Sequence, residues 1–225
     1  MIDHYDWAGG REALMRFGPF DGPIVVLAMP LFEEANRLRA FVVTMLRALA
    51  DQGIGSVLPD LPGTGESITS LEQLSVDDWP EALSCVVDRP VHVAALRGGC
   101  LIAGNVPALS RWYFAPASGA SLIRDLVRAR QVSDRDFDAT AVDQDGPPIE
   151  LAGHRAPRAL LRALGAAEAD TAPPCRIVRL ESDAAAADRK IAGAPLWRRS
   201  EPDNDPALAS LLAADLADWV RRCEN

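Results

Sequence analysis

The segment with the clearest chemical meaning is residues 95–99 (ALRGG), which follows the short β-branched run 91–95 and opens a stretch of small and apolar residues at 98–104. A strand, a sharp turn and a helix in this order hold the nucleophile of many serine enzymes, because small flanking residues allow the turn and expose the central side chain. Here the central residue is Arg97. Its guanidinium stays protonated and has no lone pair for attack on a carbonyl, so the sequence excludes serine-type acyl transfer at this position.

Two earlier segments are consistent with the same arrangement. Residues 55–59 (GSVLP) are predicted to form a strand, and the turn at 60–67 (DLPGTGES) resembles the loop after the fourth strand of α/β-hydrolases. The predicted strand 24–29 runs into residues 30–37 (PLFEEANR), where that fold places its oxyanion loop. Three motifs in the expected order imply an α/β-hydrolase-like fold, with a mostly parallel central sheet and helices on both faces.

Alternating strand and helix patterns continue along the chain and predict a single domain over residues 1–225. The predicted strands cover residues 12–17, 24–29, 55–59, 91–95, 111–116 and 176–180. The predicted helices cover residues 34–52, 76–87, 98–104, 121–130, 156–167 and 206–222. Residues 134–148 are acidic and rich in turn formers, so we expect a small cap or a mobile excursion at 131–155.

Composition and charge limit the partners of the chain. Its 225 residues are 48% hydrophobic, enough for one compact domain with a buried sheet. The formal net charge of −9 disfavours nucleic acid and anionic lipid, because both are negatively charged. The four cysteines lack C-x-x-C spacing, which predicts free thiols in the cytoplasm and neither a metal site nor a cofactor. Residues 1–10 are polar and the apolar run 23–32 is short, so we expect no signal peptide, no membrane span and a disordered terminus around His4.

Five motifs resemble a narrower group, the exosortase A system-associated hydrolases of type 2. Residues 30–37 are similar to that group's P-F-A-E-E-x-N-K, 95–99 to its G-L-R-x-G, 115–119 to its Q-P-x-x-S-G, 150–154 to its E-x-A-G-Y, and 194–202 to its strand into the last helix. The chain departs from the group at Ala95 and at His154, where glycine and tyrosine are usual. The resemblance implies a link to exopolysaccharide production and protein sorting, and the group's hydrolase label rests on fold.

The remaining members of a catalytic triad can be sought in the same sequence. An α/β-hydrolase needs an acid after its seventh strand and a histidine before its last helix. Asp183 is a candidate for the acid position, but residues 193–206 contain no histidine. The sequence therefore does not contain a complete triad, and we assign no catalytic residue.

Three interpretations of Arg97 are open. The guanidinium could be buried against Glu33 or Glu34, as a paired charge in place of the nucleophile. It could bind an anion together with the backbone N–H groups at the start of the helix. It could also act as an electrostatic stabiliser, with Glu33 or Asp183 as the base.

We predict a repurposed cleft that binds a small anionic ligand or a protein partner without hydrolysing it. The alternative is a hydrolase or acyl transferase, acting on an ester or thioester through a non-standard site. His154 is the one histidine expected near the cleft, although a surface or hydrogen-bonded loop position is the favoured interpretation of a lone histidine without a nearby nucleophile. The residues predicted to bind the ligand are Arg97, Gly98, Leu31, Phe32, Glu33 and His154.

Overall fold

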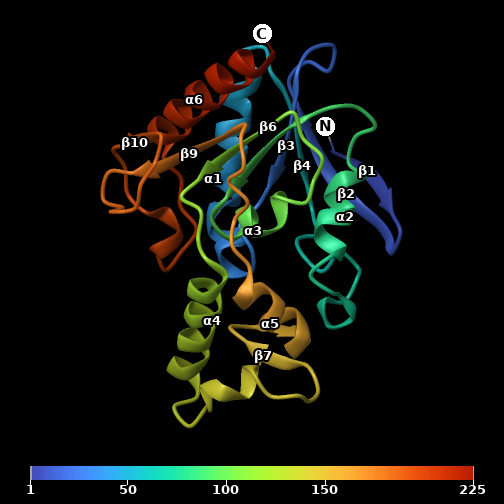
Figure 1. Cartoon of the computed structure of the whole chain (residues 1–225), viewed down its shortest axis with the longest axis vertical. Coiled ribbons are helices and arrows are strands. Elements are labelled where there is room, and N and C mark those ends of the chain that lie inside the picture. The colour runs from blue at the N-terminus through green and yellow to red at the C-terminus, as the bar shows by residue number, and fades with distance from the viewer. Residues whose placement is uncertain (1, 225) are drawn as a thin grey trace.

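The computed structural model describes residues 2–224 and is built around an eight-stranded sheet (Figure 1). The strands are β1 (Ile2–Trp7), β2 (Gly10–Phe17), β3 (Ile24–Ala28), β4 (Gly55–Pro59), β5 (His92–Leu96), β6 (Ser110–Phe114), β9 (Cys175–Leu180) and β10 (Arg189–Ile191). Their order across the sheet is β1-β2-β4-β3-β5-β6-β9-β10. The pairs β1–β2 and β2–β4 are antiparallel, and every pair from β4 to β10 is parallel. The carboxyl ends of the parallel strands therefore meet along one edge of the sheet.

Helices cover both faces of the sheet, as the alternating pattern predicts. The α-helices of the described residues are α1 (Glu33–Ala50), α2 (Asp78–Ser84), α3 (Cys100–Ala103), α4 (Gly119–Ser133), α5 (Arg158–Ala166) and α6 (Pro206–Glu224). Successive residues of a strand point to opposite faces. Val25 and Leu27 accordingly pack in one hydrophobic cluster with α1 and α6, whereas Val26 and Ala28 pack in a second cluster with α2 and α3.

A smaller group of elements lies beyond the carboxyl ends of the parallel strands, at the lower end of Figure 1. It consists of α4, α5, the 3₁₀ turn η3 (Ala139–Val142) and the antiparallel hairpin β7 (Ile149–Leu151) and β8 (His154–Ala156). Leu122 of α4 and Leu164 of α5 are buried in the same cluster as Val26. This group therefore shares a hydrophobic core with the sheet.

Four stretches differ from the sequence prediction. The polar segment around His4 forms strand β1, because its backbone pairs with β2 and Tyr5 donates a hydrogen bond from its hydroxyl to the Asp60 carbonyl at 2.8 Å. A further strand, β10, follows β9. The predicted helix 76–87 is reduced to α2, and the helix predicted at 98–104 begins as the 3₁₀ turn η2 (Arg97–Gly99).

Residues 134–148, predicted to be a turn-rich excursion, contain local structure that side chains hold. Asp138 accepts a hydrogen bond from the Thr140 backbone N–H at the start of η3, and Val142 is buried. Arg158 of α5 donates hydrogen bonds to the carbonyls of Ala141 and Pro147. These bonds tie the excursion to α5.

A buried carboxylate anchors α6 to the sheet. Asp215, which is 2% exposed, accepts hydrogen bonds from Trp112 (2.8 Å), Arg176 (2.8 and 2.9 Å) and Arg189 (2.8 Å). Burial raises the pKa of Asp215, but the hydrogen bonds from Arg176, Trp112 and Arg189 outweigh it and bring this pKa to about 2. The charge of Asp215 is thus compensated where β6, β9 and β10 meet α6.

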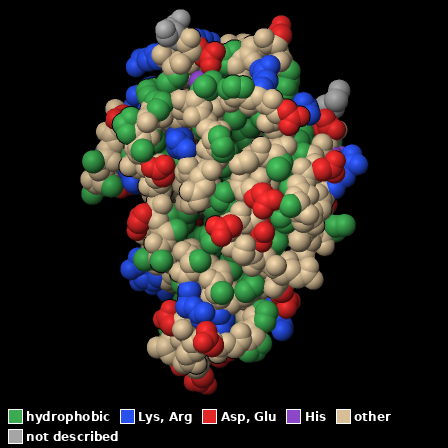
Figure 2. Space-filling view, turned by 45° about the vertical axis from the view of Figure 1, so that its right-hand side comes forward, with side chains coloured by type: hydrophobic (Ala, Val, Ile, Leu, Met, Phe, Trp, Pro, Cys, Tyr) green, Lys and Arg blue, Asp and Glu red, His purple; other side chains and the backbone are tan. Residues whose placement is uncertain are grey.

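The surface carries charges of both signs. On the face in Figure 2, acidic and basic side chains are interspersed among hydrophobic ones. Within residues 2–224, no helix is long and apolar enough to cross a membrane.

Candidate functional site

The turn after β5 has an uncommon backbone conformation at its apex. Arg97 has a φ of 53°, in the left-handed region that non-glycine residues seldom adopt. Gly99 lies so close to β3 that a Cβ there would stand 2.3 Å from the Met29 carbonyl oxygen. A glycine is required at this position because the turn packs directly against the neighbouring strand. The structure thus gives the physical reason for the small residue that the motif contains.

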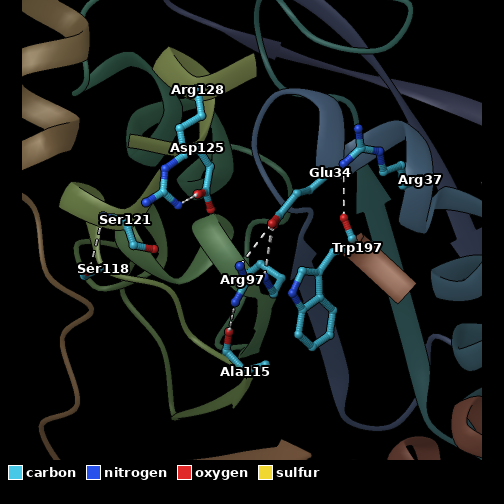
Figure 3. A network of polar contacts seen from close by, with 9 residues as sticks. All are labelled: Glu34, Arg37, Arg97, Ala115, Ser118, Ser121, Asp125, Arg128 and Trp197. Atoms are coloured by element: carbon cyan, nitrogen blue, oxygen red, sulfur yellow. Dashed lines mark hydrogen bonds and ion pairs between the residues drawn. The ribbon is translucent and has the colours of Figure 1, made fainter. Parts of the chain in front are cut away.

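Arg97 is held at this apex by an ion pair (Figure 3). Its Nε lies 3.1 Å from Oε2 of Glu34 and its Nη2 lies 3.0 Å from Oε1, which is the forked geometry of a strong arginine–carboxylate pair. Its Nη1 donates to the Ala115 carbonyl at 3.1 Å. The side chains of Arg97 and Glu34 are 14% and 16% exposed. Of the interpretations that the sequence left open, the structure therefore contains the buried pair, with Glu34 rather than Glu33.

An aromatic ring covers the guanidinium from the segment where an α/β-hydrolase would carry its histidine. Trp197 belongs to the 3₁₀ turn η4 (Leu196–Arg198), and its ring centre lies 4.5 Å from Cζ of Arg97. Its carbonyl accepts a hydrogen bond from Arg37 at 3.1 Å. Trp197 is 8% exposed. It packs against Arg97 and lines the cavity that lies beside the Arg97–Glu34 pair.

Beside this pair lies a cavity of about 600 Å³ between the start of α1, the start of α4 and the turn η4. We call it the arginine cavity, because five arginines line it: Arg37, Arg97, Arg128, Arg179 and Arg198. Four carboxylates line it as well: Glu33, Glu34, Asp125 and Asp183. The hydroxyl-bearing residues Ser118 and Ser121, at the start of α4, also lie in its wall. An adjoining cavity of about 330 Å³ shares Arg97, Asp183, Trp197 and Arg198.

Each of the four carboxylates is paired with an arginine. The pairs are Glu33 with Arg37 (3.0 Å), Glu34 with Arg97 (3.0 Å), Asp125 with Arg128 (3.7 Å) and Asp183 with Arg179 (2.7 Å). Among the described residues, Arg198 has no side-chain hydrogen bond or ion pair, and it is exposed at the rim. The Nε atom of Arg179 is buried and has no partner in the described part of the chain. The cavity therefore has a surplus of positive charge and of N–H donors.

Asp183, the candidate acid, lies in the arginine cavity and is fixed by two contacts. Its Oδ2 accepts from Arg179 and its Oδ1 accepts from the Ala185 backbone N–H at 2.9 Å. Partial burial raises the pKa of Asp183, but the Ala185 and Arg179 hydrogen bonds outweigh it and leave the pKa below its usual value. The carboxyl is thus ionised at neutral pH and engaged with a cation.

His154 does not line the arginine cavity with Arg97. It lies at the start of β8 and lines a second cavity of about 260 Å³, with its ring edge-on to Phe32 at 5.3 Å. Burial lowers the pKa of His154, although Glu33 and Glu150 oppose this shift. Among the described residues that line the arginine cavity, none is a histidine.

The six predicted ligand-binding residues therefore do not all line one cavity. Arg97, Leu31, Phe32 and Glu33 line the arginine cavity together. Gly98 is buried beside Leu31, and a Cβ there would be 3.5 Å from the Leu31 side chain. Three further lining residues, Arg128 of α4, Arg179 of β9 and Arg198 of η4, were not predicted from the sequence. In the sequence they are simply arginines within the predicted helix 121–130, the predicted strand 176–180 and the segment before the last helix.

The comparisons with known proteins concern the fold. No protein-family model matches the chain, and no curated protein matches it either. Among solved structures, it is similar to Est1E from Butyrivibrio proteoclasticus, with a TM-score of 0.64 and 14% identity over 99% of this chain and 98% of that chain. It is also similar to the mouse α/β-hydrolase domain-containing protein 10, with a TM-score of 0.63 and 12% identity over 99% of both chains. The chain has the α/β-hydrolase fold.

A third similar structure is the thioesterase domain from the curacin biosynthetic pathway, with a TM-score of 0.55 and 14% identity over 98% of this chain and 99% of that chain. At these identities the likeness concerns the fold alone. In this fold Arg97 directly follows β5, and Asp183 follows β9.

Proposed function

We propose that this protein binds a small anion in the arginine cavity and does not hydrolyse it. The observation that carries this proposal is the charge balance of the cavity, in which five arginines face four carboxylates that are each already paired. Arg198 is left without a counter-ion. An anionic ligand in the cavity would supply the counter-charge that Arg198 lacks at the rim, through charge-assisted hydrogen bonds to its guanidinium.

The donors around the cavity suit a carboxylate or a phosphate group. Arginine carries five N–H donors in a planar fork, and the ion pairs described above use only some of them. In the described part of the chain, the Nε of Arg179 has no partner and the Arg198 side chain has no hydrogen bond or ion pair. The same chemistry would recognise a carboxylate presented by a protein partner.

The alternative function, hydrolysis or acyl transfer through a non-standard site, has less support. It requires a base or nucleophile beside Arg97, drawn from Glu33, Asp183 or His154. Glu33 and Asp183 are each engaged by an arginine, and His154 lines a different cavity. A purely structural role, with the cleft filled by the Arg97 pair, is disfavoured because about 600 Å³ remains open beside the pair.

The sequence resemblance supports a setting for this role in exopolysaccharide production or exosortase-dependent protein sorting. Within residues 2–224 all four cysteines are free thiols, which supports a cytoplasmic location. We further propose that α4, α5 and the β7–β8 hairpin act as a cap, because α4 contributes one wall of the arginine cavity.

A thermal-shift screen tests the binding function. Wild type is heated with sodium benzoate, inorganic phosphate and glucose 6-phosphate, with sodium chloride at equal ionic strength as the control. A ligand at a hundredfold excess over its dissociation constant should stabilise the native state by about 2.7 kcal/mol. We expect at least one anion to raise the melting temperature above the chloride control.

Two neighbouring arginines provide a matched pair of variants. Arg198→Gln removes the unpaired charge of the cavity, whereas Arg199→Gln removes an exposed arginine that pairs with Asp203 outside it. We expect the anion-dependent shift to disappear in Arg198→Gln and to persist in Arg199→Gln. The proposal is wrong if no anion exceeds the chloride control, or if Arg198→Gln responds like wild type.

A further inference from the structure

A second cavity, separate in chemistry from the arginine cavity, lies between the start of α1, the loop after β4 and the β7–β8 hairpin. We call it the aromatic cavity. Its volume is about 260 Å³, and the residues that define its chemistry are Phe32, Asn36, Thr64, Ser67, Trp79 and His154. None of its described lining residues is an acid, a lysine or an arginine. It shares only Phe32 with the arginine cavity, so that ring forms a wall common to both.

Three rings form one side of the aromatic cavity. Phe32 stands edge-on to Trp79, with 6.3 Å between ring centres, and edge-on to His154, with 5.3 Å. Trp79 is 1% exposed and donates its indole N–H to the Pro62 carbonyl at 2.9 Å, so it supports Phe32 from behind and borders the cavity only in part. Such a wall suits the flat face of another ring through dispersion and edge-to-face contacts.

Facing these rings are polar groups with unused hydrogen-bonding capacity. Ser67 Oγ accepts from the backbone N–H groups of Gly63 (3.0 Å) and Thr69 (3.1 Å), which leaves its O–H available as a donor. The Asn36 amide makes no side-chain hydrogen bond with the described residues. By contrast, the Thr64 hydroxyl is occupied, because it donates to the Leu61 carbonyl and accepts from the Leu61 N–H.

His154 adds one donor and one acceptor. The ring nitrogens of His154 have no hydrogen-bond partner among the described residues. Burial holds the pKa of His154 below its ordinary value of 6.5, so the imidazole is neutral at neutral pH. A neutral imidazole carries one N–H and one bare nitrogen. A ligand hydroxyl can therefore accept a hydrogen bond from the first or donate one to the second.

We propose that the aromatic cavity binds a small, neutral ring that carries hydroxyl groups, such as a phenol or a monosaccharide unit. Phe32, supported by Trp79, packs against the ring face, and His154, Asn36 and Ser67 meet the hydroxyls. An ionised ligand would lose its hydration without gaining a counter-charge, so the cavity disfavours it. The volume lies below the range of about 300–1,000 Å³ for drug-sized ligands, which limits the bound part to about one ring. This binding does not depend on the anion site.

Protein NMR tests this proposal at the cavity itself. The Trp79 indole N–H and the His154 ring protons are followed while wild type is titrated with phenol, methyl α-D-glucopyranoside or sodium benzoate. We expect phenol or the glucoside to shift both sets of signals in a saturable way, and the choice between them identifies an aromatic or a saturated ring. Benzoate should leave these signals in place at the same concentrations.

Two variants remove the polar groups and keep the wall. His154→Phe retains a ring against Phe32 but lacks both nitrogens, and Asn36→Leu replaces the unpaired amide on α1. Each should weaken binding by about threefold to tenfold, the usual effect of one hydrogen bond. Arg199→Gln, at an exposed residue outside both cavities, is the control and should bind the ring as wild type does. The proposal is overturned if neither neutral ring shifts the Trp79 and His154 signals, or if benzoate shifts them equally. It is also overturned if both variants bind with unchanged affinity while their melting curves show that they are folded.

Discussion

The guanidinium of Arg97 stacks on the ring of Trp197, with 4.5 Å between Cζ and the ring centre. In a serine enzyme of this fold, the two corresponding regions of the chain supply the nucleophile and the histidine, which must exchange a proton. Here the same regions are joined by a cation–π contact and by the pair between Arg97 and Glu34. The arrangement holds the turn in place from two sides.

The first prediction concerns the pair itself. Glu34→Gln should lower the free energy of unfolding by about 3 kcal/mol, because the half-buried guanidinium of Arg97 then lacks its counter-charge. Arg97→Met should also lower the free energy of unfolding, because Glu34 then lacks its counter-charge. The double variant should lose clearly less than the sum of the two single losses, as urea unfolding would measure. Additive losses would contradict a coupled pair.

The second prediction separates backbone strain at Arg97 from the loss of its side chain. At a φ of 53°, alanine is strained and glycine is not, so Arg97→Gly should be more stable than Arg97→Ala by about 1 kcal/mol. In the middle of α6 the preference should be reversed, because glycine is a poorer helix former than alanine. Ala214→Gly should lower the free energy of unfolding by about 1 kcal/mol. Thermal melts of the four proteins, wild type included, provide the measurement. Equal stability of the two Arg97 variants would mean that the turn relaxes.

The third prediction is that Arg97→Ser does not create an esterase. The described lining of the arginine cavity contains no histidine, and Asp183 is occupied by Arg179, so a serine at the apex would lack a base. Hydrolysis of p-nitrophenyl acetate by Arg97→Ser should equal that of Arg97→Ala within error. A large gain over Arg97→Ala would reveal a base that the geometry does not indicate.

The fourth prediction concerns acid stability and Asp215. The pKa of this carboxyl is about 2 in the folded protein against an ordinary 3.8, so its contribution is complete above about pH 4 and is lost as the pH falls towards 2. The difference corresponds to about 2 kcal/mol of unfolding free energy. Asp215→Asn should be less stable than wild type at neutral pH, because Arg176 and Arg189 lose their shared partner.

The measurement for Asp215 is a series of urea unfolding curves between pH 5 and pH 2. Wild type should lose stability over this range more steeply than Asp215→Asn, by about 2 kcal/mol in total. Parallel pH profiles would show that Asp215 is not a paired carboxylate in solution.

Most of the sheet could be predicted because its central strands are short, continuous apolar runs that end in recognisable turns. The edge strands could not, since β1 is polar and β10 has only three residues, Arg189–Ile191. Their strand structure depends on pairing with β2 and β9, which the local sequence does not encode.

The site was predictable at the apex and much less so around it. Arg97 was identified from the small residues on either side, but its partner could have been either of two adjacent glutamates. Consecutive helical residues point in directions about 100° apart. Glu33 consequently reaches Arg37 one turn along α1, whereas Glu34 reaches Arg97. The orientation of α1, which begins after Phe32 with its φ of 58°, decides between them, and it is a tertiary property.

Arg97 connects three separate parts of the chain through one side chain: α1 through Glu34, the end of β6 through the Ala115 carbonyl, and η4 through Trp197. The rotational freedom of this long side chain is therefore lost when the protein folds. A molecule entering the arginine cavity meets a cation whose position is already fixed, so it need not spend binding free energy on ordering Arg97.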